Sequence, residues 1–578
     1  MVLLTVFIVN NELRDGIIVG KYFWFYGSII VVAFISPVIY FLNRNKIQIT
    51  VIDCFVFMFA VSTLLSAIVV NGNFHTTKIV TFILLVTLYF FFRILFSQSA
   101  GSMQIILSVL VITALIESVL GLMQLYGFAR SNHNLFKITG SFHNPGPYAG
   151  YLAVIFPVAL ERVMSYYKLR VKNEENTTRG KKLVTLGSYI LSFSSAIAIL
   201  LVLPANMSRA AWLALLFGSV AVIVLYSFRK IKIWMICVFL GILLSGFYGI
   251  YNLKKDSSDG RLLMWKISMQ SALQNPAGIG LGHFPEAYGK SQAEYFSLNE
   301  VSEKEKYVAG APEYAFNEYL QISIESGVIS LFLYIALIIF AMLETLKNRQ
   351  YGIFGAFISM SVFALFSYPF GMAPHLILLV FLLAATASNT NSYSKEKLCS
   401  LAFKGTAILS LTVITALCLI NRYPVYKAYK DWSDNTSYGL YDDVNEKYYR
   451  LYPLLKDNIN FLFEYAQYVA GHGKHEQSNT ILQRAVQISC DPMLYNIMGK
   501  NHQALKEYRQ AETCFTKAAN IVPNRLYPFY LLTKLYHEMG LQEKVNEMAD
   551  VVQTKEPKVH SRAIDEMRME VITLRTNN

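Results

Sequence analysis

The chain has 578 residues, of which 54% are hydrophobic, 14% are aromatic and only 15% are charged. Soluble domains carry about one quarter charged residues, so this composition excludes an ordinary soluble protein and indicates a membrane protein. The net charge is +13. Because Lys and Arg gather beside apolar runs, we interpret the excess as a topology signal and predict no binding of nucleic acid.

The first apolar stretch, Met1 to Asn10, is too short to cross a bilayer and lacks the basic start and small-residue cleavage site of a signal peptide. We expect it to be an interfacial segment or the remnant of a span. From Phe23 to Ile420, runs of about twenty apolar residues recur, and we count about twelve predicted spans. Their centres fall near residues 32, 60, 87, 115, 157, 194, 218, 242, 332, 360, 380 and 410.

Lys and Arg in short connections are retained on the cytoplasmic side and so report the orientation of the spans. They fall in alternate connections, which predicts that the remaining connections and the chain after Asn421 are external, in the periplasm of a two-membrane bacterium. The basic connections contain Arg44 and Lys46; Arg93; Lys168, Arg170, Lys172, Arg179, Lys181 and Lys182; Arg229, Lys230 and Lys232; Lys347 and Arg349; Lys395 and Lys397. The predicted external connections are 71–77, 131–147, 204–208, 253–314 and 368–375.

The tail has a repeat of 34 residues, measured from Pro523 to Pro557. On this register the small and large apolar positions resemble tetratricopeptide repeats, in which small residues let paired helices approach and proline ends the second helix. We predict an α-solenoid over 458–578 that docks a partner protein, after a linker and leading helix at 421–457; a generic helical bundle is the alternative. The residues on the register are Tyr495, Gly499, Ala511, Phe515, Ala518 and Pro523, then Phe529, Leu532, Tyr536, Gly540 and Pro557, with a degenerate copy at 458–489.

The cysteines show no spacing typical of a metal site, and we predict neither a metal nor a cofactor. Cys490 and Cys514 could pair outside the cytoplasm, although separate packed thiols are the simpler interpretation.

Polar residues are costly in apolar spans and therefore often mark a site. The first polar cluster, 140–152, runs through Asn144 into a span and could be only a loop and helix start. The second, 206–212, sets Arg209 at the outer mouth of a span, where it either anchors the helix in the headgroups or grips phosphate.

The third cluster begins with Arg261 and continues into a glycine-rich turn at 276–284 that contains His283. The turn is no nucleotide loop, because no strand and helix surround it. The fourth cluster, 313–327, opens a span; its Asn317, Glu318 and Gln321 share a helical face, as a site or as a buried hydrogen-bond network.

In this order the clusters resemble the O-antigen ligase and polymerase superfamily, over about residues 60–385. The matching motifs are Phe142 with Asn144-Pro145, Ser208-Arg209-Ala210, Arg261 with Trp265, Gly280-Leu281-Gly282-His283-Phe284, and Asn317-Glu318-Tyr319-Leu320. The resemblance implies transfer of an undecaprenyl-diphosphate-linked glycan to a hydroxyl at the outer face of the inner membrane, beside membrane lipid.

The resemblance also implies roles for residues. Arg209 and Arg261 would hold the diphosphate, and the other substrate-binding positions are Asn144, Asn317, Tyr319 and Gln321. The family's usual base is a histidine, whose position is Phe316 here. Phenylalanine takes no proton, so the remaining catalytic candidates are Glu313, Glu318 and His283, with His143 and His375 as weaker ones.

The fold class that we predict is all-α: a polytopic membrane helix bundle over 1–420 with an external loop at about 253–314, followed by the solenoid. Three acceptors stay open, namely lipid A core for a ligase, a saccharide for a polymerase, and a protein for an O-oligosaccharyltransferase. A transporter of lipid-linked saccharides and a non-catalytic envelope assembly factor are the alternatives from other classes.

Overall fold

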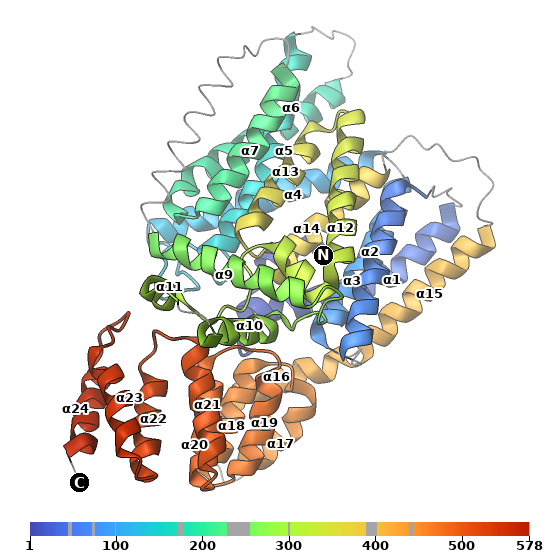
Figure 1. Ribbon diagram of the computed structural model, residues 1–578. Coiled ribbons are helices and arrows are strands. Elements are labelled where there is room, and N and C mark those ends of the chain that lie inside the picture. Colours follow the sequence, from blue (N-terminus) through green and yellow to red (C-terminus); the bar gives the residue numbers. More distant parts are fainter. Residues whose placement is uncertain are drawn as a thin grey trace.

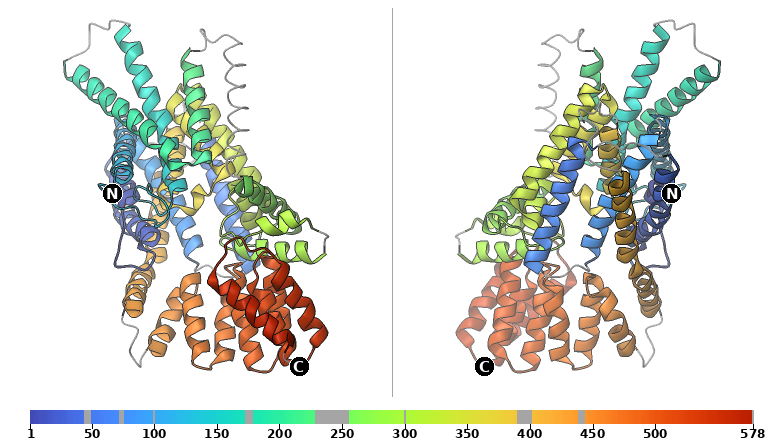
Figure 2. Two further views of the ribbon diagram at one scale, coloured as in Figure 1. Left: turned by 90° about the vertical axis from the view of Figure 1, so that its left-hand side faces the viewer. Right: turned by 90° about the vertical axis from the view of Figure 1, so that its right-hand side faces the viewer.

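The computed structural model describes residues 1–43, 49–71, 76–98, 100–171, 179–227, 255–298, 301–388, 401–437 and 444–576. Every regular element in these ranges is helical, so the predicted all-α class is confirmed for them. The apolar helices form one block, the tail helices lie together at its lower end, and α9, α10 and α11 lie between the two (Figures 1 and 2).

Eight helices in the described residues are long and apolar enough to cross a membrane. Helices α13 and α14, near the predicted centres 360 and 380, are shorter apolar helices, and the predicted span near residue 242 lies outside the described residues. The total of about twelve therefore stays a prediction. The helices of this block are α1 Gly16–Asn43, α2 Val51–Asn71, α3 Thr77–Gln98, α4 Ala100–Leu125, α5 Pro145–Val171, α6 Arg179–Val202, α7 Arg209–Ser227, α12 Glu318–Lys347, α13 Tyr351–Phe366, α14 Ala373–Ser388 and α15 Leu401–Ile420, with short 3-10 turns at Val2–Phe7, Pro204–Asn206 and Pro369–Gly371.

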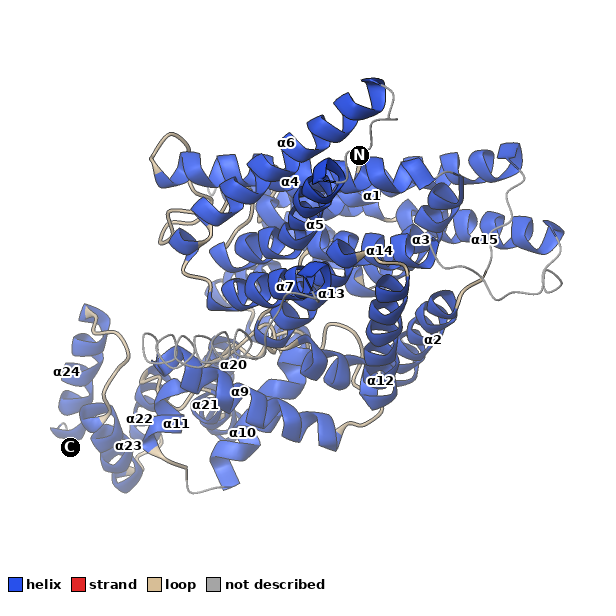
Figure 3. Cartoon of the chain, turned by 90° about the horizontal axis from the view of Figure 1, so that it is seen from above, coloured by secondary structure: helices blue, strands red, loops and turns tan. Residues whose placement is uncertain are grey.

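Small residues set the closest helix contact of the block. Helix α7 packs against α13 and α5, and α12 packs against α2 (Figure 3). A Cβ atom added at Gly218 of α7 would lie 2.6 Å from the carbonyl oxygen of Gly355 of α13. The two backbones are therefore in contact here. In lipid the hydrophobic effect does not drive helices together, so membrane helices associate through close packing of this kind.

Helix α12 is broken at Gly327, whose φ of 86° and ψ of 167° are not helical. The glycine-rich turn at 276–282 fills the break: its amides donate to the carbonyls of Ile324 and Glu325 at 2.9 Å each, and it accepts the amide of Val328 at 3.0 Å. The backbone groups that lose their helical partners at the break are therefore hydrogen-bonded to the turn. The glycines of this turn therefore serve close backbone packing.

Arg93 was predicted in a short connection, but it lies inside α3 and is buried. Its guanidinium donates to the two carboxylate oxygens of Asp53 at 2.9 and 3.0 Å, and to the hydroxyl of Ser388 at 2.7 Å. A buried charge persists only with such partners. This arginine therefore ties α2, α3 and α14 together and is not a loop charge.

The predicted external loop 253–314 is largely helical and packs onto the neighbouring predicted external connections. Arg209 donates to Ser258 at 2.9 Å, and the ring of Tyr314 stacks on Tyr368 with centroids 4.7 Å apart. Connections that the charge pattern assigned to one side thus meet one another. The helices of this region are α9 Lys255–Gln274, α10 Phe284–Leu298 and α11 Glu303–Val308.

The tail consists of helices joined by short turns. The first helices of three successive pairs begin at Ile459, Pro492 and Tyr527, which are steps of 33 and 35 residues. This spacing agrees with the predicted period, while the assignment to tetratricopeptide repeats stays a prediction. The thiols of Cys490 and Cys514 are both free. The tail helices are α16 Arg422–Ser437, α17 Val444–Leu455, α18 Ile459–Gly471, α19 His475–Ala485, α20 Pro492–Ala504, α21 Tyr508–Ile521, α22 Tyr527–Glu538, α23 Gln542–Thr554 and α24 Arg562–Thr576.

Each of these helix pairs turns through one residue with a positive φ, namely Gly473 at 78°, Lys506 at 63° and Gly540 at 70°. A side chain in this left-handed conformation costs about 1 to 2 kcal/mol, and glycine avoids that cost.

We expect Lys506→Gly to raise the free energy of unfolding by about 1 kcal/mol, measured by thermal unfolding of the full chain in detergent. The control Lys500→Gly, at an exposed position inside α20, should lower it by about 1 kcal/mol; destabilisation by both would contradict the prediction.

Candidate functional site

Two arginines meet where α7 begins and α9 passes it. Arg209 is the first residue of α7, and Arg261 on α9 donates to the carbonyl of Phe366 at 3.1 Å. Burial and the neighbouring charge of Arg209 lower the pKa of Arg261. Arg209 donates to Ser258 at 2.9 Å and to Ser257 at 3.5 Å, so it meets α9 about one turn before Arg261. Two guanidinium groups placed in this way suit an anionic ligand.

Phe316 packs against Arg261, at the position where the resembled family carries histidine. The guanidinium carbon of Arg261 is 5.3 Å from the centre of the Phe316 ring, a cation–π distance. The backbone of Phe316 has a φ of 49°, which is rare for a bulky residue and is found mainly where surrounding structure enforces it. The ring supports the guanidinium but cannot accept a proton.

Phe316, Tyr368 and Tyr314 form an aromatic wall. The Phe316 ring meets Tyr368 edge-on with centroids 5.0 Å apart, and Tyr368 stacks on Tyr314. Burial and the nearby Glu313 raise the pKa of Tyr368 to about 12, so its phenol stays protonated at neutral pH. Phe316 lines one cavity and Tyr314 lines another, so the wall stands between the two.

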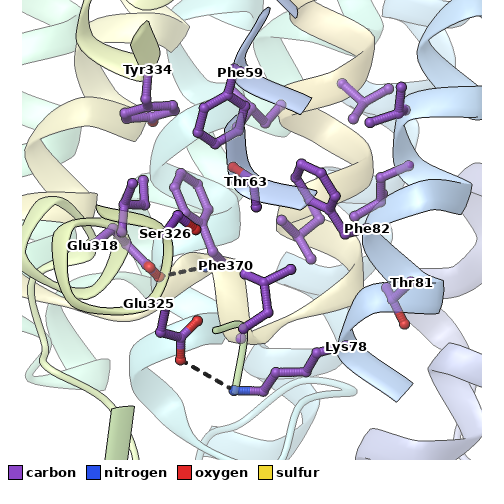
Figure 4. A pocket seen from close by; sticks show the side chains of 18 of the residues that line it. Phe59, Thr63, Lys78, Thr81, Phe82, Glu318, Glu325, Ser326, Tyr334 and Phe370 are labelled. Atoms are coloured by element: carbon purple, nitrogen blue, oxygen red, sulfur yellow. Dashed lines mark hydrogen bonds and ion pairs between the residues drawn. The ribbon is translucent and has the colours of Figure 1, made fainter. Parts of the chain in front are cut away.

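The first cavity, here called the apolar cavity, has a volume of about 350 Å³ and lies among α1, α2, α3, α12 and α14. Figure 4 shows Phe59, Phe82 and Tyr334 around it, with charged groups at one end. There Lys78 Nζ lies 3.7 Å from Glu325 Oε1, as the dashed line marks. A mostly hydrocarbon lining with one charged end suits a lipid chain whose polar head lies at that end.

The second cavity, here called the arginine cavity, has a volume of about 590 Å³. Its lining comes from α9, the segment 307–312, Phe316 and Lys558 of the tail. Arg261 and Lys558 are the cationic side chains in that lining, and the described residues that line it include no carboxylate. The cavity is therefore electropositive.

Two of the predicted substrate-binding residues hold helix starts. The side-chain oxygen of Asn317 accepts the amides of Tyr319 and Leu320 at 3.1 and 3.2 Å, so Asn317 is the N-cap of α12. The side-chain oxygen of Asn144 accepts the amide of Gly146 at 3.1 Å, where α5 begins. Asparagine is favoured at both places because its short side chain reaches unpaired amides of the first turn.

Two other predicted substrate-binding residues, Gln321 and Tyr319, lie along α12. Gln321 lines the apolar cavity, donates to Glu325 at 3.3 Å and accepts the amide of Ala315 at 3.2 Å. This is the buried network that the sequence offered as the alternative to a site. The hydroxyl of Tyr319 donates to the carbonyl of Ser361 at 3.4 Å, which connects α12 to α13. Neither residue lines the arginine cavity.

The three catalytic candidates are not brought together. Glu313 is exposed, directly precedes Tyr314 of the aromatic wall, and lines neither cavity. Glu318 is buried, lines the apolar cavity, and accepts the amide of Phe370 at 2.7 Å. His283 lies against Glu286 at 3.1 Å and lines neither cavity.

The two weaker histidines line neither cavity. His143 is half-buried, and burial, with the nearby charges of His133 and Lys21, lowers its pKa to about 4, so it stays neutral at neutral pH. His375 is fully buried, and its ring packs against Phe142, Tyr151 and Phe363. His375 therefore acts as a packing residue. Among the described residues, no group of three or more His, Cys, Asp or Glu side chains is placed to hold a metal ion.

Sequence reasoning missed Lys78, the two tyrosines of the aromatic wall, and Lys558. Lys78 had a signal that could have found it. It stands in the first turn of an apolar span on the side predicted to be external, where the charge rule places few lysines. The sequence holds no such signal for the two tyrosines or for Lys558, because the residues that they contact lie far away along the chain.

Residues 194–335 match the family model described as O-antigen ligase. This stretch contains Arg209, Arg261, the glycine-rich turn, Phe316 and most of α12. No curated protein matches the chain. The match supports similarity to the O-antigen ligase superfamily, whose members are generally glycosyltransferase-type enzymes that use lipid-linked saccharides. With the apolar helices, it indicates a multi-pass membrane protein.

Proposed function

We propose that the protein transfers a glycan from undecaprenyl diphosphate to a hydroxyl acceptor at the outer face of the bacterial inner membrane, in the manner of an O-antigen ligase, with its tail in the periplasm. The observation that carries the proposal is that Arg209 hydrogen-bonds Ser257 and Ser258 of α9, one turn before Arg261, and that Ser257 and Arg261 line an electropositive cavity. A diphosphate carries the negative charge that guanidinium groups bind, and it is also the leaving group of the reaction.

In the proposed reaction the acceptor oxygen attacks the anomeric carbon of the donor sugar, and the bond from that carbon to the diphosphate oxygen breaks. Negative charge then grows on the departing undecaprenyl diphosphate. Planar guanidinium groups of Arg209 and Arg261 stabilise that charge by paired hydrogen bonds, without a metal ion. The hydroxyl proton passes to a carboxylate.

The apolar cavity supports the lipid half of the proposal. Its hydrocarbon lining suits part of a polyprenyl chain, and Lys78 at its charged end lies 6.0 Å from the ring of Tyr314 in the aromatic wall. A lipid seated there would direct its diphosphate past Lys78 toward the two arginines. Lys78 would attract the phosphates, although it is paired with Glu325 at the same end of the cavity.

We propose Glu313 as the group that takes the proton. It is exposed beside the aromatic wall, whereas Glu318 faces the apolar cavity and its Oε1 already accepts an amide. We expect Glu313→Gln to lower the transfer rate by about 10²-fold while binding of undecaprenyl diphosphate is retained. The comparison is Glu318→Gln, assayed by release of undecaprenyl diphosphate. A large loss in Glu318→Gln with full activity in Glu313→Gln would reassign the base.

The proposed function is tested with purified full-length protein in lipid nanodiscs, given an undecaprenyl-diphosphate-linked glycan and three acceptors in turn: lipid A core, a saccharide and a protein. Release of undecaprenyl diphosphate with a glycosylated product supports transfer, and the acceptor used separates ligase, polymerase and protein O-oligosaccharyltransferase. In cells, deletion should cause lipid-linked glycan to accumulate. Unchanged lipid-linked and surface glycans would contradict the proposal.

Phe316 at the usual base position favours one further candidate, a non-catalytic factor that organises envelope enzymes. Such a factor would bind the lipid-linked glycan and release no undecaprenyl diphosphate with any acceptor. A transporter of lipid-linked saccharides would instead move the donor between the two leaflets of a proteoliposome. The transfer assay and a leaflet-exchange assay together distinguish the three.

A further inference from the structure

Three successive turns of the tail meet one short segment of the loop 253–314. This segment, 306–312, begins in α11, and its residues 307–312 line the arginine cavity. Cys490, Asn524 and Lys558, spaced 34 residues apart, stand in the turns that follow α19, α21 and α23. Each of the three donates to a carbonyl of the segment. The repeat therefore presents the same position three times to one stretch of chain.

Asn524 makes the most of these contacts. Its side-chain amide donates to the carbonyls of Lys306, Tyr307 and Ala309 at 3.2, 3.1 and 2.8 Å. Asn524 is only 9% exposed, and residues 521–523 before it are buried as well, although turns usually lie at the surface. The carbonyls at the end of a helix have no partner within it, and buried carbonyls need one. The tail supplies these partners where α11 ends.

Two further contacts hold the segment. The side-chain amide of Gln292 on α10, which is fully buried, donates to the carbonyl of Gly310 at 2.8 Å and also to the carbonyl of Ile521 in the tail. The thiol of Cys490 lies 3.5 Å from the carbonyl oxygen of Pro312. Helix α10 itself packs against α21, and both lie at the junction of the tail with the membrane block (Figure 1). The tail, α10 and the cavity wall are therefore packed as one unit.

Each of these hydrogen bonds goes to a backbone carbonyl. They fix the path of the segment and leave its side chains to line the cavity, as Tyr307 does together with Arg261 of α9. Ordering a loose segment when a ligand binds would cost conformational entropy. A wall that is held before the ligand arrives avoids that cost, so the tail contacts favour binding in the cavity.

We propose that the repeat tail acts on its own chain as a clamp on segment 306–312, and that Asn524 is the positioning residue through which the tail sets the wall of the arginine cavity. This gives the tail a role in transfer, in addition to the docking of a partner protein expected from its repeats. The effect on ligand binding rests on the proposed function, whereas the clamp itself does not.

The clamp is tested by hydrogen exchange of the full-length protein in nanodiscs, measured by mass spectrometry on peptides that cover 303–312. The amides of Lys306 and Ala309 are hydrogen-bonded there and report opening of the segment. We expect Asn524→Ala to speed exchange in this segment about tenfold, as the loss of a buried hydrogen bond allows. Asn524→Asp, which keeps the shape but removes the donor, should have the same effect.

The matched control is Asn501→Ala. Asn501 is another buried amide of the tail, at 2% exposed, and it donates to Ser478 and Asn479 at 2.9 Å each, within the tail. Its loss should leave exchange at 303–312 as in the wild type. Wild-type exchange there in both Asn524 variants, or equal acceleration by Asn501→Ala, would overturn the clamp.

The effect on the cavity is tested with undecaprenyl diphosphate on the same samples. Asn524→Ala should weaken its binding and raise the KM for the lipid-linked donor about tenfold with little change in kcat, because this residue does not touch the reacting atoms. Asn501→Ala should change neither. In the wild type, bound undecaprenyl diphosphate should slow exchange both at 303–312 and at the tail turn 522–526, a result that needs no variant.

Unchanged binding and KM in Asn524→Ala protein whose segment exchanges faster would overturn the positioning role. Slower exchange at 303–312 alone, with none at 522–526, would also count against it. Failure of the wild type to bind undecaprenyl diphosphate counts against the proposed function, while faster exchange in the Asn524 variants would still support the clamp.

Discussion

Replacing Arg209 or Arg261 by alanine is expected to lower glycan transfer by about 10² to 10³-fold each, because each removes a donor aimed at the charge that grows on the leaving diphosphate. The two guanidinium groups act on one diphosphate, so the double variant should lose less than the product of the single losses. The measurement is the rate at which nanodisc-embedded protein releases undecaprenyl diphosphate, compared at equal amounts of inserted protein.

Two further variants make this result specific. Arg130→Ala removes an exposed arginine on the same predicted external side and should leave transfer unchanged. Arg261→Lys keeps the charge but loses the planar fork and its packing on Phe316, so we expect it to recover only a small part of the activity. Normal transfer in a well-inserted Arg261→Ala protein would rule out the proposed role of this pair.

The second large effect is expected at the break of α12. Gly327→Ala places a side chain at a φ of 86° and a ψ of 167°, a region open almost only to glycine. The new Cβ would lie 2.7 Å from the carbonyl carbon of Ala277, which is backbone and cannot swing away. We expect the free energy of unfolding to fall by about 3 kcal/mol or more, measured by thermal unfolding in detergent.

The control for this prediction is Gly187→Ala on α6, where a Cβ would meet nothing within 4 Å. Alanine favours a helix over glycine by about 1 kcal/mol, so this variant should be neutral or slightly more stable. If Gly327→Ala were as stable as Gly187→Ala, the glycine-rich turn would not be filling the break as the backbone geometry indicates.

Local sequence predicted that helices open at the polar clusters near the site, and α5, α7 and α12 begin within them, at Pro145, Arg209 and Glu318. Asn317, which was expected on a helical face with Glu318 and Gln321, is instead the N-cap of α12 and has extended backbone. Arg261 and Trp265 were expected on one helix, and both lie on α9. These features depend on residues within a few positions of each other, which is why the sequence shows them.

Contacts between distant segments were not predictable in the same way. The wall joins Tyr314 and Phe316 to Tyr368, and the tail reaches the cavity through Asn524 and Lys558. Glycines at 276–282 looked like a loop motif, and only the break at Gly327 explains them. Arg93, which looked like a loop charge, is buried against Asp53.

By itself, the sequence determined the all-helical class that the described residues show and the apolar character of most of the chain. It also showed two arginines and a polar helix start in an order that resembles the O-antigen ligase superfamily. Composition and short-range periodicity carry that information, because hydrophobic burial and capping are local in sequence. Only the tertiary structure brought Arg209 to the helix that carries Arg261, set an aromatic wall between two cavities, and placed Lys558 of the tail in the lining of one of them. Those features arise from packing between residues that lie 52 positions apart for Arg209 and Arg261 and 249 apart for Ala309 and Lys558, which no local pattern encodes.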